Sequence, residues 1–189
     1  MRHILTGLIA GAMLFAAGAA AKATDLMSVV TPAPMAMAYD GDSPFDGFFI
    51  GKFGGSEICD VCDTNFEIGK VIGVNFVTDA GFVLGVEGRL ANIGYPGDPF
   101  GGLSAFKFGK LGFVVGERVM IYALAGAGGF FEYGVGWTGD WFYRLGGGVE
   151  FAATDDLSLR IDVTNLQCIA GPCAPSLAYV NAGLVWHLH

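Results

Sequence analysis

The chain has 189 residues, of which 53% are hydrophobic and only 15% are charged, and its formal net charge is −8. Soluble domains carry about 25% charged residues, so this composition is typical of a chain that exposes much apolar surface to something other than water. The acidic balance leaves no basic patch for nucleic acid, which excludes that class of partner.

The first 23 residues have the pattern of a secretory signal peptide. Arg2 and His3 precede an uncharged run at residues 4–21, and Ala21-Lys22-Ala23 is a small-x-small cleavage site. Cleavage after Ala23 removes Arg2 and Lys22 and no acid, so the net charge becomes −10. The alternative is an uncleaved membrane anchor, because an apolar run of this length could nearly span a bilayer.

Residues 24–45 predict a flexible N-terminal arm, since the Pro-, Ala- and Met-rich segment at residues 31–38 has no strand pattern. Residues 46–189 predict a single domain. No stretch after Ala23 approaches the length of a helix that spans a bilayer. The hydrophobicity is instead distributed over every second residue.

Eight stretches of alternating apolar and polar residues fill this domain. The clearest runs from Leu157 to Thr164, where apolar and polar residues alternate without interruption. Such a period predicts β-strands with two unlike faces. The strands are expected at residues 47–57, 66–77, 82–92, 103–115, 119–133, 141–152, 157–167 and 177–188.

The connections between these strands alternate in length. Tight turns rich in Asp and Gly are expected at residues 78–81, 116–118 and 154–156, and longer loops at residues 58–65, 93–102, 134–140 and 168–176. Short turns at one end and long loops at the other are typical of an outer-membrane barrel, with both chain ends on the periplasmic side. The expected fold is therefore all-β: an eight-stranded antiparallel up-and-down transmembrane β-barrel.

Four strands, at 66–77, 82–92, 141–152 and 177–188, have clearly separated faces. The strands at 47–57, 103–115 and 119–133 separate poorly, and Lys70 falls on an apolar face for no reason that the pattern supplies. Trp141, Tyr143 and Trp186 lie near strand ends, where the aromatic girdles of membrane proteins belong.

The polar face carries too few charges to solubilise a surface, and it suits an enclosed interior. The inward charges are predicted to be four acids and four bases: Glu67, Glu87, Glu150 and Asp162 with Arg89, Lys110, Arg144 and Arg160. Equal numbers are what buried charges require, because an unpaired charge is costly in a dry interior. In so narrow a barrel these side chains interlock, which predicts a plugged barrel and not a diffusion pore. A soluble barrel, the alternative, would place the charges outside.

Several segments, in this order and spacing, resemble a known family. Apart from the Pro/Ala-rich arm, they are Phe45–Gly51, Phe82–Gly88, Gly109–Phe113, Leu145–Phe151 and Leu157–Leu159. In them the chain is similar to the small OmpA-like outer-membrane proteins of alphaproteobacteria, of the porin-family or outer-membrane immunogenic protein type. The resemblance implies a monomeric eight-stranded barrel with structural and host-exposed surface roles. Members usually end on an aromatic residue that the barrel insertion machinery recognises, whereas this chain ends in His189.

Four cysteines in an exported chain favour disulfides. Cys59 and Cys62 lie in the first long loop, and Cys168 and Cys173 lie in the last. Each pair can close locally, and bridges between the two loops are also possible because the first and eighth strands are neighbours in a closed barrel. A four-Cys metal site is the alternative. A redox-active Cys-x-x-Cys is not expected, because that motif needs a helix N-terminus and no helix is predicted.

No nucleophile, base and orienting group converge in the sequence, so neither enzymatic activity nor a cofactor is expected. Beyond the signal peptide the histidines are His187 and His189. His187 faces the lumen and could meet Asp162 or Ser158. A hydrogen-bonding role for it is favoured over a catalytic one.

The sequence thus predicts an integral outer-membrane barrel with a structural and surface-exposed role. Its expected partners are outer-membrane lipid, lipopolysaccharide and the barrel insertion machinery. A narrow porin-like channel for small solutes is one alternative. The other is a surface protein that binds a ligand or host surface molecules through aromatic residues of the loops at 94–100 and 134–140, although these residues equally suit the membrane interface.

Overall fold

The structure is a computed structural model that describes residues 43–58, 65–95, 98–134, 136–137, 141–169 and 177–189. Its long strands are β1 (Gly47–Ile58), β2 (Phe66–Val77), β3 (Phe82–Tyr95), β4 (Asp98–Val115), β5 (Val119–Glu132), β7 (Phe142–Ala152), β8 (Leu157–Cys168) and β9 (Leu177–Leu188). The two-residue strand β6 (Gly136–Trp137) pairs with the end of β5. The described residues contain no helix long and apolar enough to cross a bilayer.

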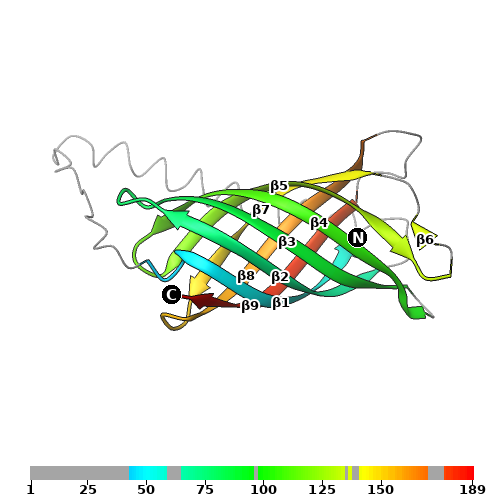
Figure 1. The fold of residues 1–189 in the computed structure, drawn as a ribbon, viewed down its shortest axis with the longest axis horizontal. Helices are drawn as coiled ribbons and strands as arrows, with labels where there is room; N and C mark the ends of the chain where they lie inside the picture. Colours follow the sequence, from blue (N-terminus) through cyan, green and yellow to red (C-terminus); the bar gives the residue numbers. More distant parts are fainter. Residues whose placement is uncertain (1–42, 59–64, 96–97, 135, 138–140, 170–176) are drawn as a thin grey trace, which may run out of the picture. The chain divides into compact units, whose positions relative to one another are not determined.

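The long strands form one closed antiparallel barrel, in which they lie side by side and tilted (Figure 1). Each strand pairs with the next along the chain, and β5 pairs with β7. The barrel closes where β1 pairs with β9, from Phe48 opposite Leu188 to Ile58 opposite Ala178. Closure satisfies the backbone N–H and C=O groups between strands without water. The predicted eight-stranded up-and-down barrel is therefore confirmed.

The strand bounds agree with the predicted ones within one residue, except around residues 93–102. There β3 continues to Tyr95 and β4 begins at Asp98, with an irregular register between Ile93 and Tyr95. The predicted long loop is therefore wrong, because most of it belongs to a β-hairpin. The alternation of side chains is lost in this segment, but the backbone ladder does not depend on that alternation and continues through it. In the same way, β6 occupies part of the predicted loop at 134–140.

Two of the predicted tight turns contain glycines with a positive φ. Gly81 has φ 81° and Gly116 has φ 66°, a conformation that side chains with a Cβ rarely adopt. In the first of these turns, Thr78 accepts a backbone hydrogen bond from Gly81 at 2.8 Å. The side-chain hydroxyl of Thr78 also accepts from the N–H of Phe82 at 3.1 Å. The short connections lie at the end of the barrel where β1 begins and β9 ends.

The outer face of the barrel is apolar. Phe48, Ile72, Phe76 and Ile161, on three different strands, are each at least 60% exposed. Exposed aromatic residues also gather near the short-turn end, at Phe48, Phe76, Phe82, Phe113, Phe151 and Trp186. This surface excludes the soluble alternative, in which the exposed face would be polar, and it matches the lipid-facing band of a membrane barrel.

The interior is partly aromatic, which explains why three strands lack clear alternation. Phe49 and Phe53 of β1, Phe106 and Phe108 of β4, and Tyr122 of β5 all have buried side chains. These inward positions are as apolar as their outward neighbours. The period-two signal is therefore weak in these strands even though their geometry is regular.

The predicted N-terminal arm extends too far along the chain, because its last residue belongs to the barrel. Phe45 is fully buried, and its ring meets that of His187 edge-on at 5.9 Å between centroids. Asn75 Nδ2 donates to the Phe45 carbonyl at 3.0 Å, and the N–H of Val77 donates to Asp46 Oδ1 at 2.7 Å. Phe45 thus covers the lumen at the short-turn end. The signal peptide and residues 24–42 of the arm lie outside the described residues and stay predictions.

Candidate functional site

All eight charges that the sequence places inside the barrel have buried side chains, with exposed fractions between 0% and 6%. They come from five strands: Glu67 of β2, Glu87 and Arg89 of β3, Lys110 of β4, Arg144 and Glu150 of β7, and Arg160 and Asp162 of β8. Their shared orientation follows from the pleat, since alternate residues of a strand point to the same side. The structure divides them among three clusters.

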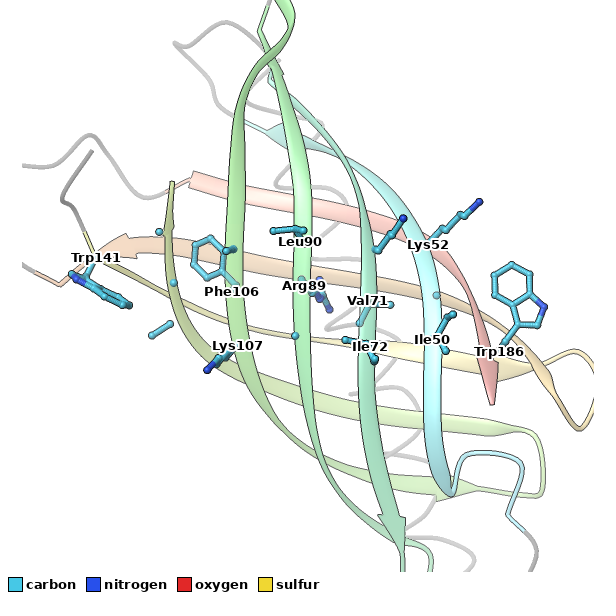
Figure 2. A pocket seen from close by; sticks show the side chains of 17 residues that line it. Ile50, Lys52, Val71, Ile72, Arg89, Leu90, Phe106, Lys107, Trp141 and Trp186 are labelled. Atoms are coloured by element: carbon cyan, nitrogen blue, oxygen red, sulfur yellow. The ribbon is translucent and has the colours of Figure 1, made fainter. Parts of the chain in front are cut away.

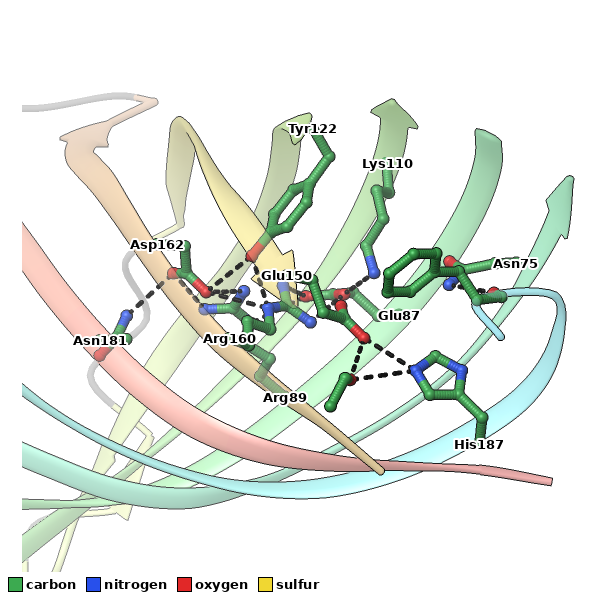
Figure 3. Close-up of polar contacts among 12 residues, drawn as sticks. Asn75, Glu87, Arg89, Lys110, Tyr122, Glu150, Arg160, Asp162, Asn181 and His187 are labelled. Carbon is green, nitrogen blue, oxygen red and sulfur yellow. Dashed lines mark hydrogen bonds and ion pairs between the residues drawn. The ribbon is translucent and has the colours of Figure 1, made fainter. Parts of the chain in front are cut away.

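The first cluster is a ring of ion pairs that crosses the lumen, called here the lumenal ring (Figure 3). Arg89 donates to Asp162 at 3.0 and 2.9 Å, and Arg160 donates to Glu87 through two bonds of 2.9 Å. Within each strand, Arg89 Nε lies 2.8 Å from Glu87 and Arg160 Nε lies 3.1 Å from Asp162. Each arginine therefore contacts both carboxylates. Two-pronged bonds of this kind are the strongest that an arginine makes with a carboxylate.

The lumenal ring spans the whole width of the barrel. Three strands separate β3 from β8 in either direction around the described barrel, so the two strands form opposite walls. The bonds from Arg89 to Asp162 and from Arg160 to Glu87 therefore join one wall to the other. Charges from both sides meet at the axis.

Lys110 and aromatic side chains surround the lumenal ring. Lys110 Nζ lies 3.2 Å from Glu87 Oε2 and 4.5 Å from the centre of the Phe49 ring. Arg160 Nε also donates to the Tyr122 hydroxyl at 2.7 Å. Cations over aromatic faces gain electrostatic stabilisation, so these rings partly replace the water that the charges have lost.

The second cluster is built around Arg144. It pairs with Glu67 at 3.1 Å, and its guanidinium lies 4.3 Å from the ring centres of both Phe106 and Tyr179. The Tyr179 hydroxyl in turn donates to Glu57 at 3.1 Å, and Glu57 is only 2% exposed. Sequence reasoning missed Glu57 as an inward acid, because it lies on β1, where apolar residues on both faces hide the alternation.

The third cluster joins Glu150, Ser158 and His187, all buried (Figure 3). His187 Nε2 lies 2.8 Å from Glu150 Oε1 and 3.2 Å from Ser158 Oγ, and Ser158 donates to the same carboxylate. Of the two contacts that the sequence allowed for His187, the structure has the one with Ser158, and Asp162 belongs to the lumenal ring.

This third cluster is not arranged as a catalytic triad. In a triad the serine and the carboxylate contact opposite nitrogens of the imidazole. Here Ser158 and Glu150 both contact Nε2 of His187, and Nδ1 has no hydrogen-bond partner within the described part of the chain. Phe45 covers the ring as well. The contacts describe a packed polar cluster.

Only one of the predicted disulfide cysteines falls within the described residues. Cys168 is the last residue of β8 and is not a free thiol. Cys59, Cys62 and Cys173 lie outside, so the pairing of the four cysteines stays a prediction. Within the ranges that the structure describes, no three His, Cys, Asp or Glu side chains are placed to hold a metal ion.

A closed barrel with an apolar outer face, exposed aromatic residues near one end and paired charges inside is a transmembrane β-barrel of the outer-membrane type. The outward side chains supply the lipid-facing surface, and the inward ones are neutralised by one another. This class follows from the geometry of the chain itself.

Comparisons with known proteins agree on the fold. No protein-family model and no curated protein matches the chain. Among solved structures it is similar to a de novo designed transmembrane β-barrel, with a TM-score of 0.50 and 11% identity over 74% of this chain and 93% of that one. Two others are Ail, the attachment invasion locus protein of Yersinia pestis (TM-score 0.47, 14% identity, 75% and 98% covered), and the N-terminal barrel domain of Pseudomonas aeruginosa OprF (0.45, 11%, 73% and 96%). At this identity the likeness to the designed barrel shows the fold alone.

Proposed function

We propose that this chain is an integral outer-membrane barrel with a structural, surface-exposed role in the cell envelope, and that the lumenal ring plugs its interior. The observation that carries this proposal is the pair of two-pronged bonds that join β3 to β8 across the axis. The barrel acts as a monomer in contact with outer-membrane lipid and lipopolysaccharide, after delivery by the barrel insertion machinery. The resemblance to small OmpA-like proteins of alphaproteobacteria supports the same role.

The packing of the lumen supports a plug. A cavity of about 10 Å³ borders Arg89, Arg160 and Asp162, which is room for about one water molecule. Phe45 covers the lumen at the short-turn end, and the arginine of the second cluster is held between two rings. A solute would have to break several buried ion pairs to pass, and breaking one such pair is strongly destabilising.

The location is tested by separating the membranes of cells that make the protein and comparing boiled and unboiled samples on a gel. We expect the protein in the outer-membrane fraction, with a mobility that changes on boiling, because a closed barrel resists detergent until it is heated. A soluble periplasmic band with no such change would contradict the proposed location.

The plug is tested by conductance of the purified protein in planar bilayers. The native barrel should produce no steady current. The double variant Glu87→Ala/Arg160→Ala removes a cross-lumen pair without leaving either partner alone, and it should produce discrete current steps. A matched variant, Arg118→Ala/Asp155→Ala, removes an exposed pair that joins two turns and should produce no current. Steady current through the native barrel would overturn the plug and favour the narrow channel.

The host-binding alternative depends on the loops at 94–100 and 134–140. The side chains of Tyr95, Phe100 and Trp137 are not among those that the structure describes. This alternative therefore stays a prediction. Binding of whole cells to host surfaces, with and without residues 134–140, would test it.

A further inference from the structure

Three lysines point outward from the wall that strands β1 to β4 form, and together they are called here the outer lysine patch. Lys52 of β1, Lys70 of β2 and Lys107 of β4 are all exposed. Lys52 lies directly opposite Lys70 in the β1–β2 pairing. Lys107 lies opposite Gly88, which is the β3 neighbour of Ile72 on the other side. The three ammonium groups therefore share one stretch of the outer wall.

The orientation of these side chains is visible at close range. Figure 2 shows Lys52 and Lys107 extending away from their strands, whereas Arg89 of the lumenal ring extends behind β3. Ile50 and Ile72, which surround the patch, are outward and about half or more exposed. The lysines thus interrupt an apolar surface that faces lipid. Lys70, whose place on an apolar face the sequence pattern alone does not explain, is thus one member of a group of outward lysines.

Within the described residues, no carboxylate balances the charge of the patch. The outward strand positions that the structure describes carry no Asp or Glu, and the ion pairs of the described residues do not involve Lys52, Lys70 or Lys107. A cation that faces hydrocarbon without a partner is destabilising, and charges at such positions are a mark of function. Nothing in the described strands balances this positive charge, so the patch suits an anion from outside the chain.

The height of the patch places it near the long-loop edge of the apolar band. Two polar outward residues lie toward this end: Asn92 of β3 is level with the outward position next to Lys70, and Ser56 of β1 is two outward positions beyond Lys52. Asn92 lies opposite Ile68, the outward position next to Lys70 on β2. Neighbouring outward positions are about 6.6 Å apart along a strand. A lysine at this depth can extend its stem along the apolar wall and bring its ammonium group to the polar edge.

The wall beside the patch has room for a ligand. A Cβ added at Gly88 or Gly109, both outward, would meet no atom closer than 3.9 Å. The barrel therefore does not require glycine at these two positions, in contrast to Gly148, where a Cβ would lie 2.6 Å from the Tyr122 hydroxyl. Bare backbone next to the lysines leaves a shallow surface against which acyl chains can pack.

We propose that the outer lysine patch binds the phosphate groups of an anionic lipid of the outer leaflet. The lysines supply the charge, their height matches a headgroup at the edge of the apolar band, and the wall at Gly88 and Gly109 receives acyl chains. A second copy of the chain is not the occupant, because the outward strand positions described here would offer it the same lysines and no carboxylate. This inference rests on the proposed outer-membrane location.

The test is native mass spectrometry of the folded barrel in neutral detergent micelles, titrated with diphosphorylated lipid A. We expect the triple variant Lys52→Gln/Lys70→Gln/Lys107→Gln to bind this lipid at least about tenfold more weakly, since each lysine near a charged surface contributes appreciably. The triple variant with arginine at the same positions should bind as the native barrel does. Unboiled gel mobility verifies that every variant is folded.

Three controls make the result specific. Arg118→Gln removes the same charge as one lysine but at a turn, and it should leave lipid binding unchanged. Lipid A without its phosphates should not bind the native barrel. Inorganic phosphate at equal concentration should not compete.

Equal binding by the native and triple-glutamine barrels would overturn the proposal. The proposal would also be overturned if Arg118→Gln bound as weakly as the triple-glutamine barrel, or if inorganic phosphate competed fully. Because binding is measured on the folded barrel in micelles, a failure here is separate from a failure of the fractionation or conductance experiments.

Discussion

Arg89 of β3 holds Asp162 of β8 in a two-pronged ion pair across the lumen, although 73 residues separate them in the chain. Both side chains are at most 6% exposed. Each also contacts a second charge on its own strand, Glu87 for Arg89 and Arg160 for Asp162. The pair is therefore one side of a closed ring, and removing either member leaves the other only partly neutralised.

Asp162→Asn should lower the free energy of unfolding by about 3 kcal/mol, because breaking a buried ion pair leaves a charge without its partner. Arg89→Met should cost a similar amount. The double variant should cost clearly less than the sum of the two, since Glu87 and Arg160 keep their own two-pronged pair. Urea unfolding in lipid vesicles, followed by unboiled gel mobility, measures all three. Additive losses would show that the two side chains do not interact.

Phe45→Ala should lower the free energy of unfolding by about 3 kcal/mol, because Phe45 is fully buried at the short-turn end and its removal leaves a cavity. Phe48→Ala is the matched control. Phe48 is three residues further along and 65% exposed on the outer face, so its loss should have a smaller effect. The same urea titration compares them, and equal effects would contradict the placement of Phe45 inside the lumen.

Gly148→Ala should prevent formation of the heat-modifiable barrel. A Cβ at this position would overlap the backbone oxygen of Ile161 and lie 2.6 Å from the Tyr122 hydroxyl, which belongs to the surroundings of the lumenal ring. Gly54→Ala is the control, since its Cβ would approach no atom closer than 3.8 Å. Refolding yield on an unboiled gel distinguishes them. A normal yield for Gly148→Ala would show that the lumen has spare room there.

Asp155→Asn should change the free energy of unfolding by less than about 1 kcal/mol. Its ion pair with Arg118 is 3.3 Å long but exposed, with 49% of the Arg118 side chain and 87% of the Asp155 side chain accessible. Solvent screens such pairs, whereas buried pairs are screened much less. A loss as large as that of Asp162→Asn would mean that the ion pair between these two turns is part of the cooperative core.

The strands and the inward orientation of the charges follow from the sequence because alternation is a local property. Glu67 and Arg144 each lie between adjacent apolar residues in a strand where apolar and polar residues alternate. The face on which each charge lies can therefore be predicted directly. The inward orientation of Glu57 could not be predicted in this way, because the inward positions of its strand include the apolar residues Phe49 and Phe53. The burial of Phe45 could not be predicted, because a single aromatic residue before the first strand is not part of any periodic pattern.

A local sequence pattern cannot predict which charged side chains pair with one another inside the lumen. That Arg89 meets Asp162, or that His187 meets Glu150, depends on the register of every pairing around the barrel. A shift of two residues in one pairing would keep all faces the same and change every partner. The hairpin near Tyr95 was not predictable for a related reason: its backbone pairing continues beyond the point where the side-chain alternation ends.

The position of the lumenal ring has a consequence for how the chain is assembled. Its cross-wall bonds require β3 and β8, which face each other only after β1 has met β9. A curved but open sheet leaves Arg89 and Arg160 with acids of their own strands and no bond to the far wall. The cross-wall bonds of the lumenal ring therefore form only when the seam between β1 and β9 closes. An open sheet lacks these bonds, so contact between its charged side and lipid would leave charges only partly neutralised, which is costly.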